Sequence, residues 1–305
     1  MATVVGASTG SIDVKSTVDQ LIEVEMVKRI DPIDTKVTAR QASISAIAAI
    51  KTLASSLQDS MSGFADTTQF TVSATLTEAQ ATANLSTAAQ SFVTNYNALQ
   101  AAIVKYGSVD LSDSTRDTTA EVPLFGDSVL AEVKQLMRSG YSAGLTYTNA
   151  LSARTDKTSV IGFGDLGISR KTDGTLTFSK SAFNRSASSD TTVLTPPSDA
   201  DVLKADSLYR QPKLLDRFAA GTSSALATSL TRVGSTIVGT FDVRTDQYNK
   251  QLYTLRNKRT SESARIETQR ARLLKTYSQL NSLLANMSST SNFLTAQLAS
   301  LSKNN

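Results

Sequence analysis

The chain has 305 residues, of which 40% are hydrophobic and only 6% aromatic, and its net charge of +4 is mild. It contains neither cysteine nor histidine, which removes the thiol nucleophile, disulfide bonds, the commonest zinc ligands and the side chain most often used for proton transfer near neutral pH. Catalysis is therefore disfavoured, and we expect no catalytic residue, no metal site and no cofactor.

Two further classes are disfavoured by what the sequence lacks. No run approaches the ~18 apolar residues of a membrane span, so we expect no membrane insertion. Residues 1–15 have neither a basic region nor an apolar core, so they are not a general secretory signal peptide. We expect a protein that either stays in the cytoplasm or leaves by a route that reads another signal.

The N-terminal part predicts two helices separated by a proline. Residues 12–30 show helical spacing of apolar residues, with Ser11 or Asp13 as a candidate N-cap. The residue before Pro32 disfavours helical geometry while proline suits a first helical position, so a second helix should begin there and end near Gly63. The apolar face of the first helix comprises Ile12, Val14, Val18, Leu21, Ile22 and Met26.

The middle of the chain mixes strand and helix patterns. Residues 70–76 alternate apolar and polar residues and predict a strand, whereas 78–106 return to helical spacing that Gly107 ends. A polar loop should cover 108–123, followed by a short helix over 127–138.

The next region predicts β structure. Residues 158–182 should form it, with Asp173 and Gly174 at a hairpin turn. The Ser-, Asp- and Pro-rich residues 184–201 predict a flexible loop.

The C-terminal part is helical from about residue 212, and its longest element should cover 242–301 with a candidate break at 288–292. Every seventh residue from Leu252 forms a mostly apolar row, comprising Leu252, Arg259, Ile266, Leu273, Leu280, Met287, Leu294 and Leu301. The parallel row is weaker, so this helix should pack along one narrow seam. A helix of this length needs partners, either the N-terminal helices or neighbouring subunits.

The expected fold is mainly α, with long N- and C-terminal helices forming a coiled-coil leg or bundle and a small head that contains a β-hairpin. Residues 1–30 and 280–305 should be terminal leg helices that order on assembly. Residues 31–279 should form the inner helical-bundle head, with its β element at about 158–182.

Three patterns admit both a functional and a structural interpretation. Gly162, Gly164 and Gly167 match a dinucleotide-binding fingerprint, but they lead into hairpin residues rather than a helix, so turn glycines are favoured. Residues 250–275 hold eight basic and two acidic residues, which fits a solvated face or pairing with Asp and Glu of another chain better than nucleic-acid binding. The acidic pairs at 31/34 and 199/201 lack partner ligands and fit helix capping and solvation.

Several segments resemble one known family, in its order along the chain. Residues 10–25 (GSIDVKSTVDQLIEVE) closely resemble the start of the flagellar filament cap family, FliD or hook-associated protein 2. Similar matches are residues 92–99 (FVTNYNAL), 123–128 (PLFGDS), 166–176 with its LGI and DGTL pieces, and the C-terminal helix around 287–291 (MSSTS). The resemblance covers nearly the whole chain.

The resemblance implies a structural, secreted protein at the distal end of the bacterial flagellar filament that promotes flagellin folding and insertion. It implies a closed ring of copies, five being commonest, with flagellin and hook-associated proteins as neighbours and an export chaperone at the C-terminal helix. Export would use the flagellar export apparatus without a cleaved signal peptide. The expected assembly interface comprises Ile12, Val14, Val18, Leu21, Ile22, Met26, Leu280, Leu284, Met287, Leu294, Leu298 and Leu301.

The sequence departs from the family in one respect. Members usually carry β-rich outer domains that form a plate, inserted at the position of residues 77–90, and here they are missing. Cell adhesion through that plate is therefore in doubt. The competing hypotheses are a hook–filament junction protein, a cytoplasmic coiled-coil adaptor and, more distantly, an enzyme.

Overall fold

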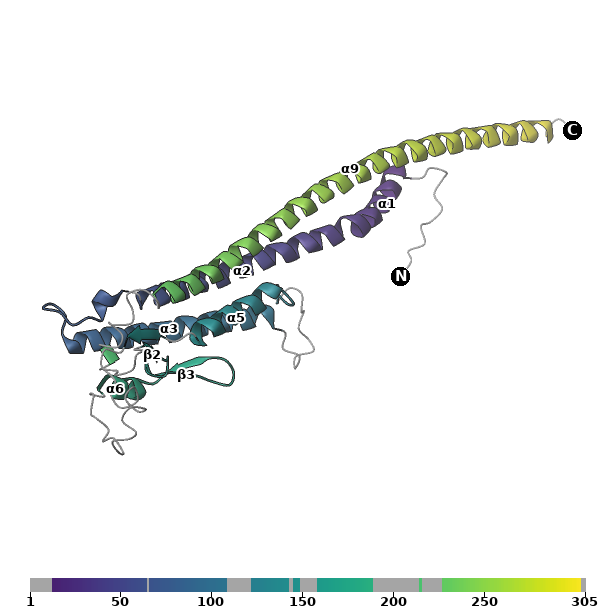
Figure 1. The fold of residues 1–305 in the computed structure, drawn as a ribbon. Helices are drawn as coiled ribbons and strands as arrows, with labels where there is room; N and C mark the ends of the chain where they lie inside the picture. Colours follow the sequence, from purple (N-terminus) through teal and green to yellow (C-terminus); the bar gives the residue numbers. More distant parts are fainter. Residues whose placement is uncertain are drawn as a thin grey trace, which may run out of the picture. The chain divides into compact units, whose positions relative to one another are not determined.

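The fold is that of a computed structural model, which describes residues 13–64, 66–108, 122–142, 145–148, 158–188, 214–215 and 227–302. It is mainly α, as predicted (Figure 1). The chain divides into two compact units. An end unit combines the residues up to Gln41 with those from Lys250 onward, and a central unit comprises Ala42–Asn249.

The end unit contains α1 (Val14–Arg29), the start of α2 (Asp31–Gly63) and the C-terminal part of α9 (Ala227–Ser302). Asp13 caps α1, because its carboxylate accepts a 3.1 Å hydrogen bond from the Ser16 N–H. The predicted interruption before Pro32 is confirmed as a single turn residue, Ile30, whose carbonyl accepts from the N–H groups of Ile33 and Asp34.

The central unit is a bundle formed by the rest of α2, α3 (Glu78–Gly107), α5 (Ser128–Ser142) and the beginning of α9. A capping box between Thr77 and Gln80 starts α3, which ends at Gly107 as predicted. Residues 78–90, where the resemblance implies an inserted domain in other members, are the first turns of this helix. The short helix predicted over 127–138 is confirmed and extends to Ser142.

Two antiparallel strand pairs accompany the bundle. β1 (Leu145–Thr148) pairs with β2 (Thr158–Ile161), and β3 (Ile168–Arg170) pairs with β4 (Leu176–Phe178). The predicted hairpin at Asp173 and Gly174 is therefore confirmed. Gly174 adopts a φ of 86°, and the Asp173 carboxylate accepts from the Thr175 N–H at 2.8 Å.

The core of the central unit lies where α2, α3 and the β elements meet. Phe92 on α3 contacts Phe64 edge-on at 6.0 Å between ring centroids and stacks on Phe163 at 5.2 Å. Phe163 in turn stacks on Tyr141 of α5. These four aromatic residues form a cluster that ties the hairpin region to the bundle.

Up to Ser188, two expectations about secondary structure were wrong and two short elements were not predicted. Residues 70–76 form turns instead of a strand, because the Ser73 hydroxyl accepts from the N–H groups of Thr75 and Leu76 and the Ser73 N–H donates to the Leu76 carbonyl. A short 3-10 helix, Thr67–Gln69, precedes them. Strand β1 was not predicted. The end of the predicted β region (158–182) and the start of the predicted loop (184–201) instead form one helix, α6 (Lys180–Ser188). Residues 189–201 lie outside the described residues.

The long C-terminal helix was predicted in kind but not in extent. α9 begins at Ala227 and continues through 288–292 without the expected break. At ~1.5 Å rise per residue, its 76 residues would span ~110 Å. The expected division into terminal leg helices (1–30 and 280–305) and a head (31–279) rests on which segments become ordered on assembly. It remains a prediction.

Candidate assembly surface

A small apolar seam holds α1 on α9 in the end unit. Val18, Ile22 and Ile30 are buried against Ile266, and the half-buried Leu273, Leu274 and Tyr277 extend the contact along α9. Ile266 and Leu273 belong to the predicted every-seventh row. The row therefore packs first against the N-terminal helices of the same chain.

Ion pairs flank this seam and fix its direction. Asp19 pairs with Arg270 at 2.6 Å, and Arg29 with Glu262 at 3.5 Å. The Asp34 carboxylate accepts two hydrogen bonds from the Arg259 guanidinium, at 2.6 and 3.1 Å. Residue numbers rise along α1 and α2 as their partners' numbers fall along α9, so the packing is antiparallel.

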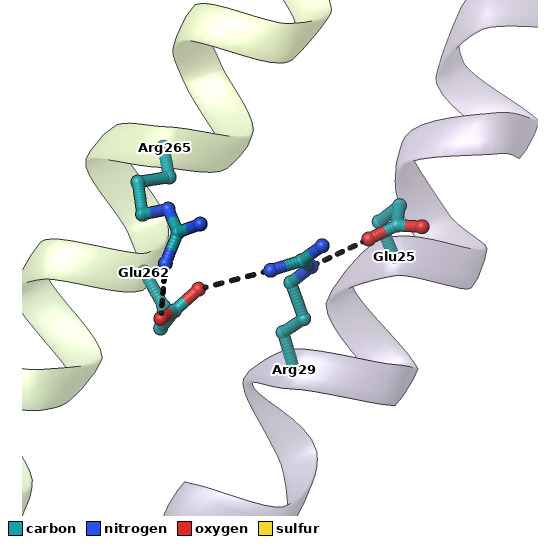
Figure 2. A network of polar contacts seen from close by, with 4 residues as sticks. All are labelled: Glu25, Arg29, Glu262 and Arg265. Atoms are coloured by element: carbon teal, nitrogen blue, oxygen red, sulfur yellow. Dashed lines mark hydrogen bonds and ion pairs between the residues drawn. The ribbon is translucent and has the colours of Figure 1, made fainter.

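Figure 2 shows the most connected part of this set, in which Arg29 lies between Glu25 on its own helix and Glu262 on α9. Glu262 also accepts a 3.1 Å hydrogen bond from Arg265. The hydrogen bond from Arg29 holds the pKa of the Glu25 carboxyl below its usual value, and Glu25 raises the pKa of Arg29.

Beyond Tyr277, the large apolar residues of α9 as far as Leu298 are exposed, apart from the half-buried Leu284. Leu280 and Leu284 begin a stripe that continues with Met287, Leu294 and Leu298 at helical spacing. Met287 is 61% exposed, Leu294 55% and Leu298 67%. Figure 1 shows this yellow end of α9 continuing past α1. A row of large apolar side chains so exposed marks an interaction surface.

A second exposed apolar row lies on α1. Leu21, Val24 and Val27 are spaced three residues apart and are all exposed, while Met26 is exposed beside them. Since α1 buries Val18 and Ile22 on α9, this row belongs to the part of α1 that the seam leaves uncovered. The end unit thus has two uncovered apolar rows.

The Asp127 carboxylate is almost fully buried in the central unit and has a structural role. Asp127 caps α5 through the Val129 N–H, and both its carboxylate oxygens accept from Arg244 of α9, at 2.9 and 2.6 Å. The Tyr248 hydroxyl donates to it as well. Burial raises the pKa of Asp127, but the Arg244, Tyr248 and Val129 hydrogen bonds outweigh it and hold that pKa below the usual value.

The glycine triplet forms a turn, as favoured from the sequence. The Gly162 N–H donates to the Asp165 carboxylate at 2.9 Å, and Gly167, with φ 71°, leads directly into β3. A dinucleotide site would need a helix N-terminus at this point.

The described residues contain no group of three or more acidic side chains placed to hold a metal ion. None of the helices in the described part of the chain combines the length and the apolar character of a membrane-spanning helix.

Comparison with known proteins decides the family. The family described as "Flagellar hook-associated protein 2 C-terminus" matches residues 61–289, about three quarters of the chain. The chain belongs to this family. Neither the curated proteins nor the solved structures contain a significant match to this chain. Membership of the hook-associated protein 2 family makes this a flagellar protein of a structural family.

The expected interface residues of this hook-associated protein 2 family member fall into three groups. Val18 and Ile22 are buried inside the chain's own seam, and Val14 is half-buried beside them. Leu21 and Met26 on α1 are exposed, as is the α9 stripe apart from the half-buried Leu284. Ile12 and the side chain of Leu301 lie outside the described residues.

Sequence reasoning missed Val24 and Val27, although both are more exposed than Leu21. Their spacing of three from Leu21 was the available signal. It was obscured because the broad apolar pattern of α1 does not indicate which of its residues α9 covers.

The basic run on α9 is divided between ion pairs within the chain and a solvated face. Arg259 and Arg270 pair with acidic residues of α2 and α1 in the same chain, rather than with another chain or with solvent alone. Arg265 pairs with Glu262 on α9 itself, and the remaining cations of the run are exposed: Lys250, Arg256, Lys258, Arg272 and Lys275.

Proposed function

We propose that this protein caps the distal end of the bacterial flagellar filament and promotes the folding and insertion of flagellin. The observation that carries the proposal is the exposed apolar stripe from Leu280 to Leu298 on α9. Burying apolar surface contributes ~25 cal/mol per Å², so such a stripe favours association with neighbouring subunits. Family membership supports the flagellum as the place where those neighbours are found.

The exposed row on α1 supports an assembly in which each copy has more than one neighbour. Leu21, Val24 and Val27 cannot share a partner helix with Val18 and Ile22, which α9 already covers. A contact between two different surfaces of identical subunits closes into a ring or continues as a helix. In this proposal the copies form a closed ring, a homopentamer, while the α9 stripe docks among the last flagellin subunits and hook-associated proteins.

The mechanism requires no covalent chemistry by the cap. Flagellin would emerge unfolded, fold in the space that the ring shields, and join the filament before the ring steps onward. The protein would itself be exported by the flagellar export apparatus, with an export chaperone covering the C-terminal stripe of α9 until assembly.

The test is to image where gold-labelled protein binds on filaments that still carry their hooks, since the hook marks the proximal end. Label at the end opposite the hook is the expected result. A double variant, Leu294→Glu with Leu298→Glu, should abolish this binding. Its matched control, Asn286→Glu with Ser289→Glu, adds the same charge on the opposite face of the helix and should bind normally.

Two outcomes would overturn the proposal. Label at the hook end would identify a junction protein instead. Equal binding by the stripe variant and the control would show that the stripe is not the docking surface.

A further inference from the structure

A groove in the end unit has a chemistry that neither the seam nor the apolar rows use. It is lined by Lys36 and Arg40 of α2 and by a four-residue stretch of α9, and its volume is about 530 Å³. The α9 residues that line it are Lys250, Gln251, Thr254 and Leu255. No acidic side chain lies among the lining residues.

Three positive charges therefore converge on this groove. Lys36 and Lys250 make no ion pair with any described residue, and Arg40 adds a third cation. Lys36 and Arg40 are four residues apart on one helix, so both lie on the face of α2 that lines the groove. A bound anion would face Lys36 and Lys250, which pair with no carboxylate of the described residues, whereas the nearby Arg259 already has its carboxylate in Asp34.

The remaining lining is suited to a polypeptide. Leu255 is half-buried and supplies an apolar surface, and the stems of the two lysines extend it. The exposed Gln251 amide can donate to and accept from a backbone, while the Thr254 hydroxyl is already bonded to the Lys250 carbonyl. The lining contains no aromatic residue on which a nucleic-acid base could stack.

We infer that this groove binds an acidic, amphipathic polypeptide segment of another chain. Its carboxylates would lie against Lys36, Arg40 and Lys250, and an apolar side chain would contact Leu255. The argument is charge complementarity combined with an apolar floor, and it does not depend on the capping function. If the protein proves to act at the hook end instead, the groove and its ligand chemistry are unchanged.

The inference can be tested on the full-length protein with a fluorescein-labelled 15-residue helical peptide that has Glu on one face and Leu on the other. Fluorescence anisotropy should show binding that weakens at least tenfold when salt rises from low to physiological concentration and beyond. A matched peptide with Gln in place of Glu should bind at least tenfold more weakly at low salt.

Variants locate the site. Lys36→Gln with Lys250→Gln should raise the Kd for the acidic peptide at least fivefold, and Leu255→Gln should raise it several-fold with the charges intact. The control, Arg272→Gln with Lys275→Gln, removes two exposed cations of α9 outside the groove and should change the Kd less than twofold. Circular dichroism should show unchanged helix content in all of them.

Three results would overturn the inference. One is no binding of the acidic peptide at millimolar concentration. Another is equal weakening by the control variant, or equal binding of polyglutamate without leucine, since either would indicate only diffuse charge attraction. The third is tighter binding of a 15-nucleotide oligothymidine, which would identify a nucleic-acid surface.

Discussion

Asn97 on α3 makes two hydrogen bonds to the backbone of Leu176 on β4, donating to its carbonyl and accepting from its N–H, each at 2.8 Å. The Asn97 side-chain amide thus makes the two backbone hydrogen bonds that a neighbouring strand would make at the edge of the hairpin. Leu176 itself is buried, so its backbone groups have little access to water. Two sequence segments that resemble the family, 92–99 and 166–176, are joined by this contact.

Replacing Asn97 should therefore destabilise the central unit. Asn97→Leu leaves two backbone groups without partners, and we expect the free energy of unfolding to fall by about 2–4 kcal/mol. Urea denaturation monitored by circular dichroism measures this. Thr94→Ala, on the exposed side of the same helix, should change stability by less than about 0.5 kcal/mol. Equal effects of the two substitutions would contradict the role given to Asn97.

The Asp127 cluster predicts how stability depends on pH. The pKa of Asp127 is lowered in the folded state, so its contribution is complete above the unfolded-state value of ~3.9 and is lost as pH falls through the folded-state pKa. Asp127→Asn should cost about 2–4 kcal/mol at pH 7 because it leaves Arg244 without its bidentate partner.

The measurement is the urea midpoint of wild type and Asp127→Asn between pH 7 and pH 2.5. The gap between them should be constant from pH 7 to about 5 and narrow below the unfolded-state pKa of ~3.9. Asp59→Asn, at an exposed position of α2, is the control and should follow wild type throughout. A gap that persists unchanged at pH 2.5 would show that the charge of Asp127 is not what stabilises α5 on α9.

The ion pairs of the end unit predict a charge-swap result. Asp19→Arg places two cations together where Asp19 and Arg270 now pair, and it should lower the melting temperature of the end unit at low salt. Adding Arg270→Asp should recover part of the loss. Both effects should shrink in 0.5 M NaCl, because the pair is partly exposed. Failure of the double variant to recover would indicate that this pair does not fix the register of α1.

Helical periodicity was sufficient to predict most of the fold. α1, α2, α3 and α9 were found because each repeats apolar residues at helical spacing over many turns, and their ends carry signals such as Gly63 and Gly107. α6 was missed although Ser179 provides an N-cap, with its hydroxyl accepting from the Ala182 N–H at 3.3 Å. The segment is too short, and too rich in serine, for its periodicity to stand out.

The failures have a common cause in contacts that local patterns do not encode. Residues 70–76 alternate like a strand, but no strand among the described residues pairs with them and Ser73 closes a turn instead. β1 depends on pairing with β2, and the ion pair of Asp19 with Arg270 joins residues 251 positions apart. The apolar pattern predicted apolar faces on α1 and α9, but not that Val18 and Ile22 would be covered within the chain.

Burial along α9 predicts a gradient of hydrogen-exchange protection in the dilute monomer. Ile237, Phe241, Tyr248 and Ile266 are buried, whereas nearly all residues from 278 to 298 are exposed. Amides of the exposed stretch should exchange at least ~100-fold faster than those at 237–252, since a helix without tertiary contacts opens easily. α1 should be intermediate, because Val18 and Ile22 are packed. Uniform protection along α9 would contradict this gradient.

The glycine triplet offers a matched pair that separates a structural role from a binding role. A Cβ at Gly167 would lie 2.6 Å from the Ser179 carbonyl oxygen and 2.9 Å from the Phe183 nitrogen, and its φ of 71° is unfavourable for alanine. At Gly164 a Cβ would meet nothing within 4 Å. Gly167→Ala should therefore cost at least ~2 kcal/mol in urea denaturation, while Gly164→Ala should change stability by less than about 0.5 kcal/mol.

The same pair tests the turn interpretation directly. The close approach at Gly167 comes from the start of α6 packing on the turn, so Gly167→Ala must displace Ser179 and Phe183 or lose the contact. A turn role predicts that both variants differ in stability alone and that NAD or ATP at millimolar concentration leaves the melting temperature of wild type unchanged. A stabilising shift with either nucleotide that Gly164→Ala abolishes would mean that the triplet binds phosphate after all.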